Sequence, residues 1–316
     1  INPSVGNGAD CPYYNGDGAT WGNGELTYAF NIQRQLTGNT VIEAGYLSTL
    51  ASNIRATLLA LNQINYRNLP ENLSPFIAAG RTLLNSRMGS AATNAAGLKP
   101  PFAAFNTLWG TGATVAQAFR PFPQYSTVNT DMGGGDRIGH STYHSLMVKL
   151  QRRYSAGLTL QASYTLSKAL TDAEDGPMDK YNRRLQKSIA SYDQTQAVKV
   201  TYVYELPFGA RRKYLSSKRW ASSIFGGWRI SGIHGYSSGT PMSLGTTVSF
   251  PIFNSSNRIT AATYDGWRGP IAGTKFDPAV DKFLQPASWF GTQPTDRFGN
   301  VTRYNPKLRG WPVYSE

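Results

Sequence analysis

Side chains of two kinds alternate strictly along residues 158–167 of this chain. The even positions are apolar or aromatic (Leu158, Leu160, Ala162, Tyr164, Leu166), and the odd positions are small or amide residues (Thr159, Gln161, Ser163, Thr165, Ser167). Because side chains on a β-strand repeat every two residues, this segment predicts a strand with one apolar and one hydrogen-bonding face. An alternating run of about ten residues is typical of a strand in a transmembrane β-barrel.

The preceding segment repeats the pattern and predicts the other arm of a hairpin. Its apolar residues Leu146, Val148 and Leu150 alternate with Ser145, Lys149 and Gln151. Only residues 154–157 separate the two arms, which is a hairpin-length connection. Further alternating segments occur at residues 26–36, 40–48, 194–206 and 228–236. We therefore predict an all-β protein, an antiparallel transmembrane β-barrel of which this chain forms a part.

The lengths of the connections support a barrel that crosses a membrane. They are short at 37–39 and 154–157, medium at 207–226, and long at 51–140, 171–191 and 238–316. In up-and-down topology alternate connections lie on opposite sides, so all the long ones fall on one side, as in bacterial outer-membrane barrels. We expect residues 1–24 to form a loop, residues 25–316 to belong to the barrel domain with long extracellular loops, and a short helix near 52–64.

Composition agrees with a membrane barrel and excludes a membrane-spanning helix. Aromatic residues make up 12% of the 316 residues and charged residues 16%. No stretch approaches 18 uncharged apolar residues, whereas barrel strands are half polar. The net charge of +13 comes from dispersed basic residues with no nucleic-acid-binding module around them. We therefore expect no nucleic-acid partner, and the single cysteine, Cys11, allows no internal disulfide.

Four patterns that can carry chemistry have simpler structural readings. Residues 235–239 match G-x-S-x-G, but no helix-forming segment and no later histidine follow. His140 and His144 lie on a predicted strand, where four residues span about 13 Å and cannot share a metal. The carboxylates of Asp172, Glu174, Asp175 and Asp179 favour a solvated acidic loop over a calcium site. Gly133–Gly135 precedes no helix, so a phosphate cradle is not expected. We predict no catalytic residue, no metal site and no cofactor, and hence no enzyme.

Aromatic residues near the predicted strand ends have a role in a membrane protein. Tyr164, Tyr202, Tyr204, Trp228 and Tyr236 fall at strand ends or on the apolar face. Aromatic girdles at the two membrane–water interfaces use such residues. Ordinary packing in a sheet core is the alternative.

The amino-acid sequences of several segments also resemble those of one protein family. Residues 141–168, together with 202–209, 226–232, 238–241 and 31–46, resemble TonB-dependent outer-membrane receptors of the Oar-like group. In that group a carboxypeptidase-regulatory-like domain and a plug precede a barrel of about 22 strands. The resemblance spans residues 25 to 245. The plug, the N-terminal strands and the last strands have no counterpart here, so we expect a portion of a larger barrel.

The resemblance implies a function and partners. A receptor of this kind resides in the bacterial outer membrane and imports a scarce ligand, with energy from a TonB-type partner that acts through the plug. Siderophores, oligosaccharides and peptides all remain open as ligands. Thr159, Gln161, Ser163 and Thr165 would then face the lumen, and Leu158, Leu160, Ala162 and Leu166 would face outer-membrane lipid. The alternatives are a structural or adhesive cell-surface β-protein without transport, and a secreted soluble binding domain.

Overall fold

The structure is a computed structural model that describes most of the chain. The described residues are 22–56, 59–128, 136–174, 179–209, 226–243 and 304–315, with shorter pieces between 213 and 291. Cys11, Gly133–Gly135, Asp175 and most of the predicted loop 1–24 lie outside them.

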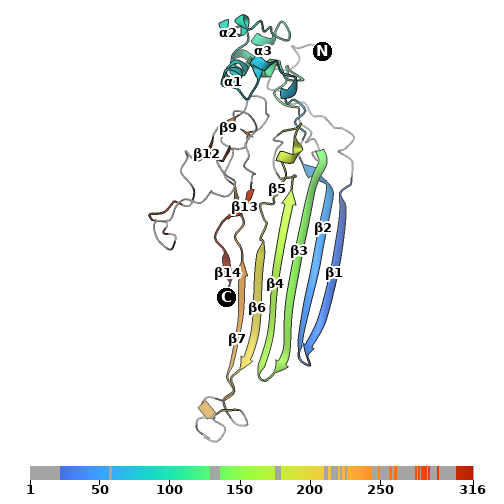
Figure 1. The fold of residues 1–316 in the computed structure, drawn as a ribbon, viewed down its shortest axis with the longest axis vertical. Helices are drawn as coiled ribbons and strands as arrows, with labels where there is room; N and C mark the ends of the chain where they lie inside the picture. The colour runs from blue at the N-terminus through green and yellow to red at the C-terminus, as the bar shows by residue number, and fades with distance from the viewer. Residues whose placement is uncertain are drawn as a thin grey trace.

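One antiparallel sheet dominates the described residues (Figure 1). Its strands are β1 (Gly24–Thr37), β2 (Thr40–Ala56), β3 (Asp136–Ser155), β4 (Leu158–Thr171), β6 (Gln196–Glu205), β7 (Arg229–Ser237) and β14 (Val313–Ser315), paired in that order. The two-residue β5 (Ser188–Ile189) pairs with the end of β4. The six alternating segments of the sequence are therefore strands, and the predicted antiparallel all-β fold is confirmed. The sheet is not closed, because β1 and β14 lie at its opposite edges.

Cross-strand register sorts the side chains onto two faces. The central row of the apolar face consists of Ile32, Ala44, Val148, Tyr164, Val198, Tyr236 and Tyr314. Two-residue steps along each strand keep the same face, so Leu158, Leu160, Ala162 and Leu166 share it. The intervening residues Thr159, Gln161, Ser163 and Thr165 lie on the opposite face. The alternation of the sequence is thus continued across the whole sheet.

The β3–β4 hairpin closes through a two-residue turn at Ala156 and Gly157. Both residues have positive φ, 51° and 82°, which is the backbone twist that matches a right-handed pair of strands. A Cβ on Gly157 would lie 2.9 Å from the carbonyl oxygen of Glu205. The Gly157 carbonyl in turn accepts a hydrogen bond from the Glu205 amide at 2.7 Å. Glycine at this position therefore allows the turn and the neighbouring β6 to approach closely.

The connection between β2 and β3 folds into a compact unit, which we call the helical cap (residues 59–128). It contains η2 (Tyr66–Asn68), η3 (Glu71–Leu73), α1 (Ala78–Asn85), α2 (Ala91–Ala95), α3 (Phe105–Trp109), η4 (Gly110–Gly112) and α4 (Val115–Ala118). The helix predicted near residues 52–64 is wrong, because residues 52–56 continue β2 and residues 59–64 form turns and extended chain. Of the apolar residues in this segment, Ile54 lies on β2 and Ile64 is buried in the cap.

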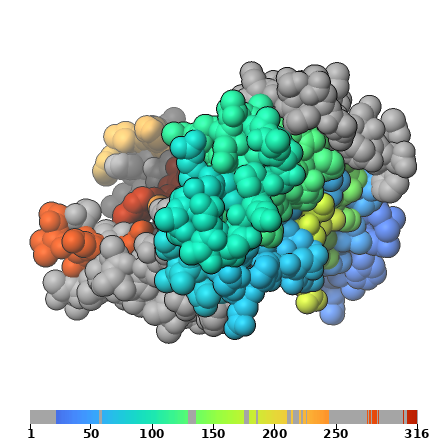
Figure 2. Space-filling view, turned by 90° about the horizontal axis from the view of Figure 1, so that it is seen from above, coloured from blue at the N-terminus to red at the C-terminus, as the bar shows by residue number. Residues whose placement is uncertain are grey.

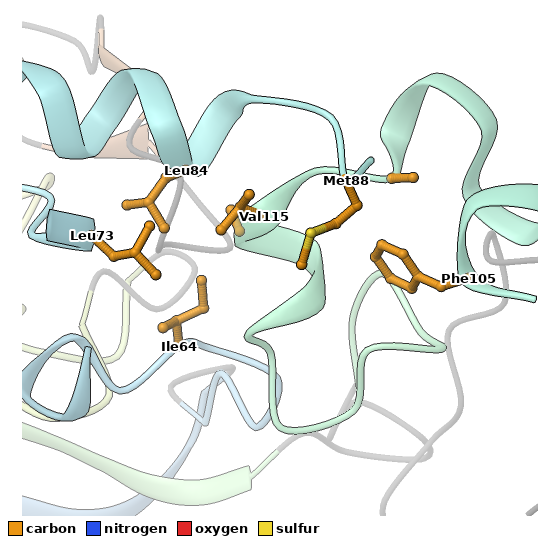
Figure 3. Close-up of a cluster of buried hydrophobic side chains, with 8 residues drawn as sticks. Ile64, Leu73, Leu84, Met88, Phe105 and Val115 are labelled. Atoms are coloured by element: carbon orange, nitrogen blue, oxygen red, sulfur yellow. The ribbon is translucent and has the colours of Figure 1, made fainter. Parts of the chain in front are cut away.

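The cap has its own hydrophobic core. Ile64, Leu73, Leu84, Met88, Phe105, Ala113, Val115 and Ala116 pack together and are almost fully buried. Figure 3 shows these side chains converging from several short elements of the cap. The rings of Phe102 and Phe105 meet edge to face, with centroids 5.5 Å apart. Main-chain contacts such as Met88 N–H to the Ala113 carbonyl join the elements, so the long connection is a folded unit and not an irregular loop.

Long and short connections lie at opposite ends of the strands. The two tight turns, at residues 38–39 and 156–157, and the β6–β7 connection lie at the end away from the cap (Figure 1). The connections from β2 to β3, β4 to β6 and β7 to β14 lie at the cap end. Seen from this end, the cap stands in front of the strands (Figure 2). The described residues of the connection after β7 include three pairs of short antiparallel strands: β8 (Pro241–Ser243) with β13 (Tyr304–Arg309), β9 (Val248–Ser249) with β10 (Ser256–Asn257), and β11 (Thr260–Ala261) with β12 (Phe290–Gly291).

Candidate functional site

The polar face of the sheet is the first part of the candidate site. One row across it consists of Gln33, Glu43, Lys149, Ser163, Lys199, Gly235 and Ser315. The next row places Gln161 between Gln151 and Thr201. Charged and amide side chains thus lie side by side on several strands, and together they form hydrogen-bonding rows of the kind that line a water-filled barrel.

This face also carries apolar side chains. Leu47, Met147, Val203 and Ile233 occupy it, and all four are exposed. The opposite face carries the tyrosines that the sequence placed there. Tyr202 stacks on His234 with centroids 5.7 Å apart, and Tyr236 lies 5.3 Å from Tyr314. The two faces differ mainly in their charged and amide residues.

The second part of the site is the attachment of the cap to the β4–β6 connection. Asp179 is buried and accepts hydrogen bonds from Gln63 Nε2 at 2.7 Å, from the Tyr66 hydroxyl at 3.4 Å and from the Tyr181 amide at 2.9 Å. Gln63 is itself fully buried, and its Oε1 accepts from the Lys180 amide at 2.7 Å. One carboxylate and one amide thereby connect two long connections at the same end of the strands.

The phenols beside Asp179 stay neutral. Burial raises the pKa of Tyr66, and the negative charge of Asp179 raises it further. Burial, and then the negative charge of Asp179, also raise the pKa of Tyr181. Tyr66 therefore keeps its proton and remains a donor to the carboxylate as the pH rises, which preserves the contact in mildly alkaline conditions.

A second buried amide organises the C-terminal end of the cap. Asn62 Nδ2 donates to the carbonyls of Phe122 and Tyr125, and its Oδ1 accepts from the Phe122 amide at 2.8 Å. Arg120 donates to the Asn62 carbonyl at 3.0 Å. Burial lowers the pKa of Arg120. The Pro-aromatic segment around residues 121–125 is thus held by specific hydrogen bonds.

The described acidic residues of the 171–191 connection, Asp172, Glu174 and Asp179, have structural roles, so the expectation of a solvated acidic loop is wrong for these three. Asp172 accepts from the His140 amide at 2.6 Å and from Arg183 at 3.3 Å. Glu174 accepts from the amide and hydroxyl of Ser191. With Asp179 buried under the cap, each described carboxylate has separate partners. Among the described residues, no three His, Cys, Asp or Glu side chains are placed to hold a metal ion.

A buried ion pair between Arg309 and Asp193 holds β13 near the end of β4. Asp193 accepts from the Ala169 amide at 2.6 Å and from Thr195 at 3.1 Å. Arg309, in β13, places its Nη2 2.7 Å from Oδ2 of the same carboxylate. The Arg309 side chain is 15% exposed and the Asp193 side chain is 1% exposed. Arg309 also donates to the carbonyls of Asp193 and Gly239. This pair lies at the cap end of the sheet.

The remaining sequence motifs have structural roles. His140 and His144 are four residues apart on β3, and His144 Nδ1 lies 2.8 Å from the Tyr46 hydroxyl. Residues 235–239 leave β7 and lead into β8 instead of a helix, and the Ser238 hydroxyl accepts from the Gln196 amide at 3.2 Å. The nucleophile-elbow geometry is therefore absent from this described segment.

Removal of the Asp179 carboxylate should release the cap. In Asp179→Ala the buried Gln63 amide loses its acceptor, and an unsatisfied buried group costs about 1–3 kcal/mol. We expect tryptic cleavage within residues 59–128 to become about tenfold faster, because proteolysis follows the population of the open form. Glu71→Ala, at an exposed position of the cap, is the matched control and should be cleaved at the wild-type rate. Equal rates for Asp179→Ala and wild type would show that this contact does not hold the cap.

Sequence reasoning missed the cap, although local signals for it exist. Ser90 accepts from the Thr93 amide and Thr114 accepts from the Gln117 amide, so each caps the first turn of a helix. Gly97, with φ of 70°, follows α2. A serine cap followed by alanines and a glycine is a helix signal that is obscured by the small residues of the segment. No local signal marks Asp179 or Asp193 as buried.

Comparison with known proteins identifies the family. No curated protein and no solved structure matches the chain. The described part of the chain contains no helix of the length and apolar character needed to cross a bilayer. The family model described as "Outer membrane beta barrel domain" matches residues 26–314, which include the cap and all of the sheet except Gly24, Glu25 and Ser315. Members of such a barrel family are typically not enzymes. The chain therefore belongs to the outer membrane β-barrel domain family, and its location is the bacterial outer membrane.

Proposed function

We propose that this outer-membrane chain forms part of the barrel wall of a TonB-dependent receptor that imports a scarce ligand into the periplasm. The observation that carries the proposal is the polar face, with rows of amide and charged side chains such as Glu43, Lys149 and Lys199. Its apolar counterpart suits lipid. In this proposal Thr159, Gln161, Ser163 and Thr165 face the lumen, and Leu158, Leu160, Ala162 and Leu166 face lipid.

The resemblance of residues 141–168 to the Oar-like receptors supports the finer assignment. Connection lengths support the orientation, since outer-membrane barrels have short periplasmic turns and longer extracellular loops. The cap end is then extracellular, and the Ala156–Gly157 turn is periplasmic. The energy-coupling partner would act on a plug supplied by the same polypeptide, and the ligand would be a siderophore, an oligosaccharide or a peptide.

A second candidate is an adhesive or structural outer-membrane protein without transport. The helical cap favours it, because a connection with its own core and fixed attachments presents a rigid surface away from the barrel. The coding sequence upstream of Ile1 distinguishes the two candidate functions. A plug and a TonB box encoded there support transport, and a signal peptide directly before Ile1 contradicts it.

Uptake in the native bacterium tests the proposal. Cells lacking this gene and cells lacking the TonB-type protein are given a mixture of labelled ferric siderophores, oligosaccharides and peptides. We expect both strains to lose uptake of the same compound. Wild-type uptake of every compound by the strain lacking this gene, together with reduced surface attachment, would contradict transport and support adhesion.

A further inference from the structure

Two arginines interrupt the apolar face near the end with the tight turns. Arg152 of β3 lies in register between Thr40 and Leu160, and that row continues to Tyr202 and Gly232. Arg34 of β1 lies in register with Ile42, one two-residue step further into the sheet. By strand spacing and rise, their Cα atoms are about 12 Å apart on either side of β2. An arginine on a face of this kind needs an anionic or polar partner.

The described residues supply no such partner. Arg152 is half-buried, and its Nε is buried without a hydrogen-bond partner. Among the described residues no carboxylate pairs with Arg152 or Arg34. The nearest cross-strand neighbours of Arg152 on this face are a threonine and a leucine. A desolvated guanidinium edge without a partner points to a ligand that is not part of the protein.

The position of Arg152 matches a membrane–water interface. Along β3 the apolar face carries Leu150, Val148 and Leu146 before the next polar position, His144. Eight residues of strand span about 27 Å, close to the height of the apolar band of an outer-membrane barrel. Tyr202 lies in the same row as Arg152 and Tyr204 lies one two-residue step nearer the turn, and aromatic side chains gather at such interfaces.

We infer that Arg152, assisted by Arg34, binds the phosphate of a phospholipid headgroup in the periplasmic leaflet. The guanidinium fork matches phosphate oxygens with two parallel hydrogen bonds. The acyl chains of the same lipid would lie along the apolar rows of Leu150 and Val148. The assignment to the periplasmic leaflet rests on the proposed function, in which the end of the sheet with the tight turns is periplasmic. A lipid A phosphate from the opposite leaflet is the other source of the same chemistry.

Lipid binding to the native protein, purified in detergent and stripped of lipid, tests the site. Phosphatidylglycerol and lipid A are added in separate titrations and followed by native mass spectrometry. We expect Arg152→Gln to weaken binding of phosphatidylglycerol about fivefold, and the double variant with Arg34→Gln about 25-fold, since each cation near an anionic headgroup contributes about equally. Arg152→Lys should retain most of the binding.

Arg153→Gln is the matched control, because Arg153 is the exposed neighbour on the other face. It should bind phosphatidylglycerol as the wild type does. Unchanged binding of phosphatidylglycerol to Arg152→Gln would overturn the proposed site. If Arg152→Gln lost binding of lipid A and kept binding of phosphatidylglycerol, the assignment to the periplasmic leaflet would be overturned. If Arg152→Gln fails to insert into the membrane, the single variant Arg34→Gln tests the site. Binding of phosphatidylglycerol to Arg34→Gln at the wild-type level would then contradict the inference. Failure of the uptake experiment would leave these lipid titrations unaffected, so the two proposals are tested separately.

Discussion

Replacement of Val148 by arginine should block assembly of the barrel, whereas replacement of Met147 by arginine should not. Val148 lies in the central row of the apolar face, between Ala44 and Tyr164. An arginine on the lipid side near the bilayer midplane costs about 2–4 kcal/mol. Met147 is the adjacent residue on the polar face, between Gly45 and Thr165. Both residues are apolar, so only the face differs between the two variants.

Assembly is measured as the fraction of protein that is folded in the outer membrane and migrates as a compact form on an unheated gel. Val148→Met controls for the size of the new side chain and should assemble normally. Equal loss of the folded form in Val148→Arg and Met147→Arg would contradict the assignment of the two faces to lipid and water. The same result would remove the basis for a lumen at Thr159, Gln161, Ser163 and Thr165.

Arg309→Ala should destabilise the cap end of the sheet far more than Arg229→Ala destabilises the turn end. Arg309 and Asp193 form a buried pair at 2.7 Å. Removal of one partner leaves a buried charge without compensation, which costs about 3–5 kcal/mol. Arg229 and Glu205 meet at 2.6 Å, but Arg229 is 68% exposed. Exposed pairs contribute about 0–1 kcal/mol.

Hydrogen exchange in lipid or detergent distinguishes the two variants. The Ala169 amide donates to Asp193, so its protection reports the ion pair directly. We expect that protection to fall by more than a hundredfold in Arg309→Ala, which corresponds to about 3 kcal/mol, and to stay within about fivefold in Arg229→Ala. Similar effects of the two substitutions would show that burial does not set the strength of the Arg309 pair.

Alternation along single segments was enough to predict most of the sheet. β6 begins and ends within about two residues of the predicted segment, and β4 begins at the predicted Leu158 and continues four residues beyond Ser167, because one apolar and one polar face leave a single strand register. β2 extends to Ala56, and β3 begins already at Asp136, so both strands reach well beyond the alternating segments. Their outer parts carry mixed side chains, and pairing with the neighbouring strand extends them there.

The cap and the roles of the acidic residues could not be predicted in the same way. Segment 59–128 combines short helices of four to eight residues, too short to show a clear helical period. Its core forms only when Ile64, Phe105 and Val115 meet. Asp179 and Asp193 belong to a run of charged and polar residues that looks solvated along the chain. Their burial depends on partners more than a hundred residues away, Gln63 and Arg309.

The sequence by itself determined the strands, their two faces and the ends at which the connections lie, because these follow from a side-chain period of two and from the alternation of direction in a meander. Only the tertiary structure decided that the longest connection is a folded cap, that its carboxylate partners are buried, and that the Arg152 Nε is buried without a hydrogen-bond partner among the described residues. These features depend on contacts between residues far apart in the chain, and no local pattern encodes such contacts.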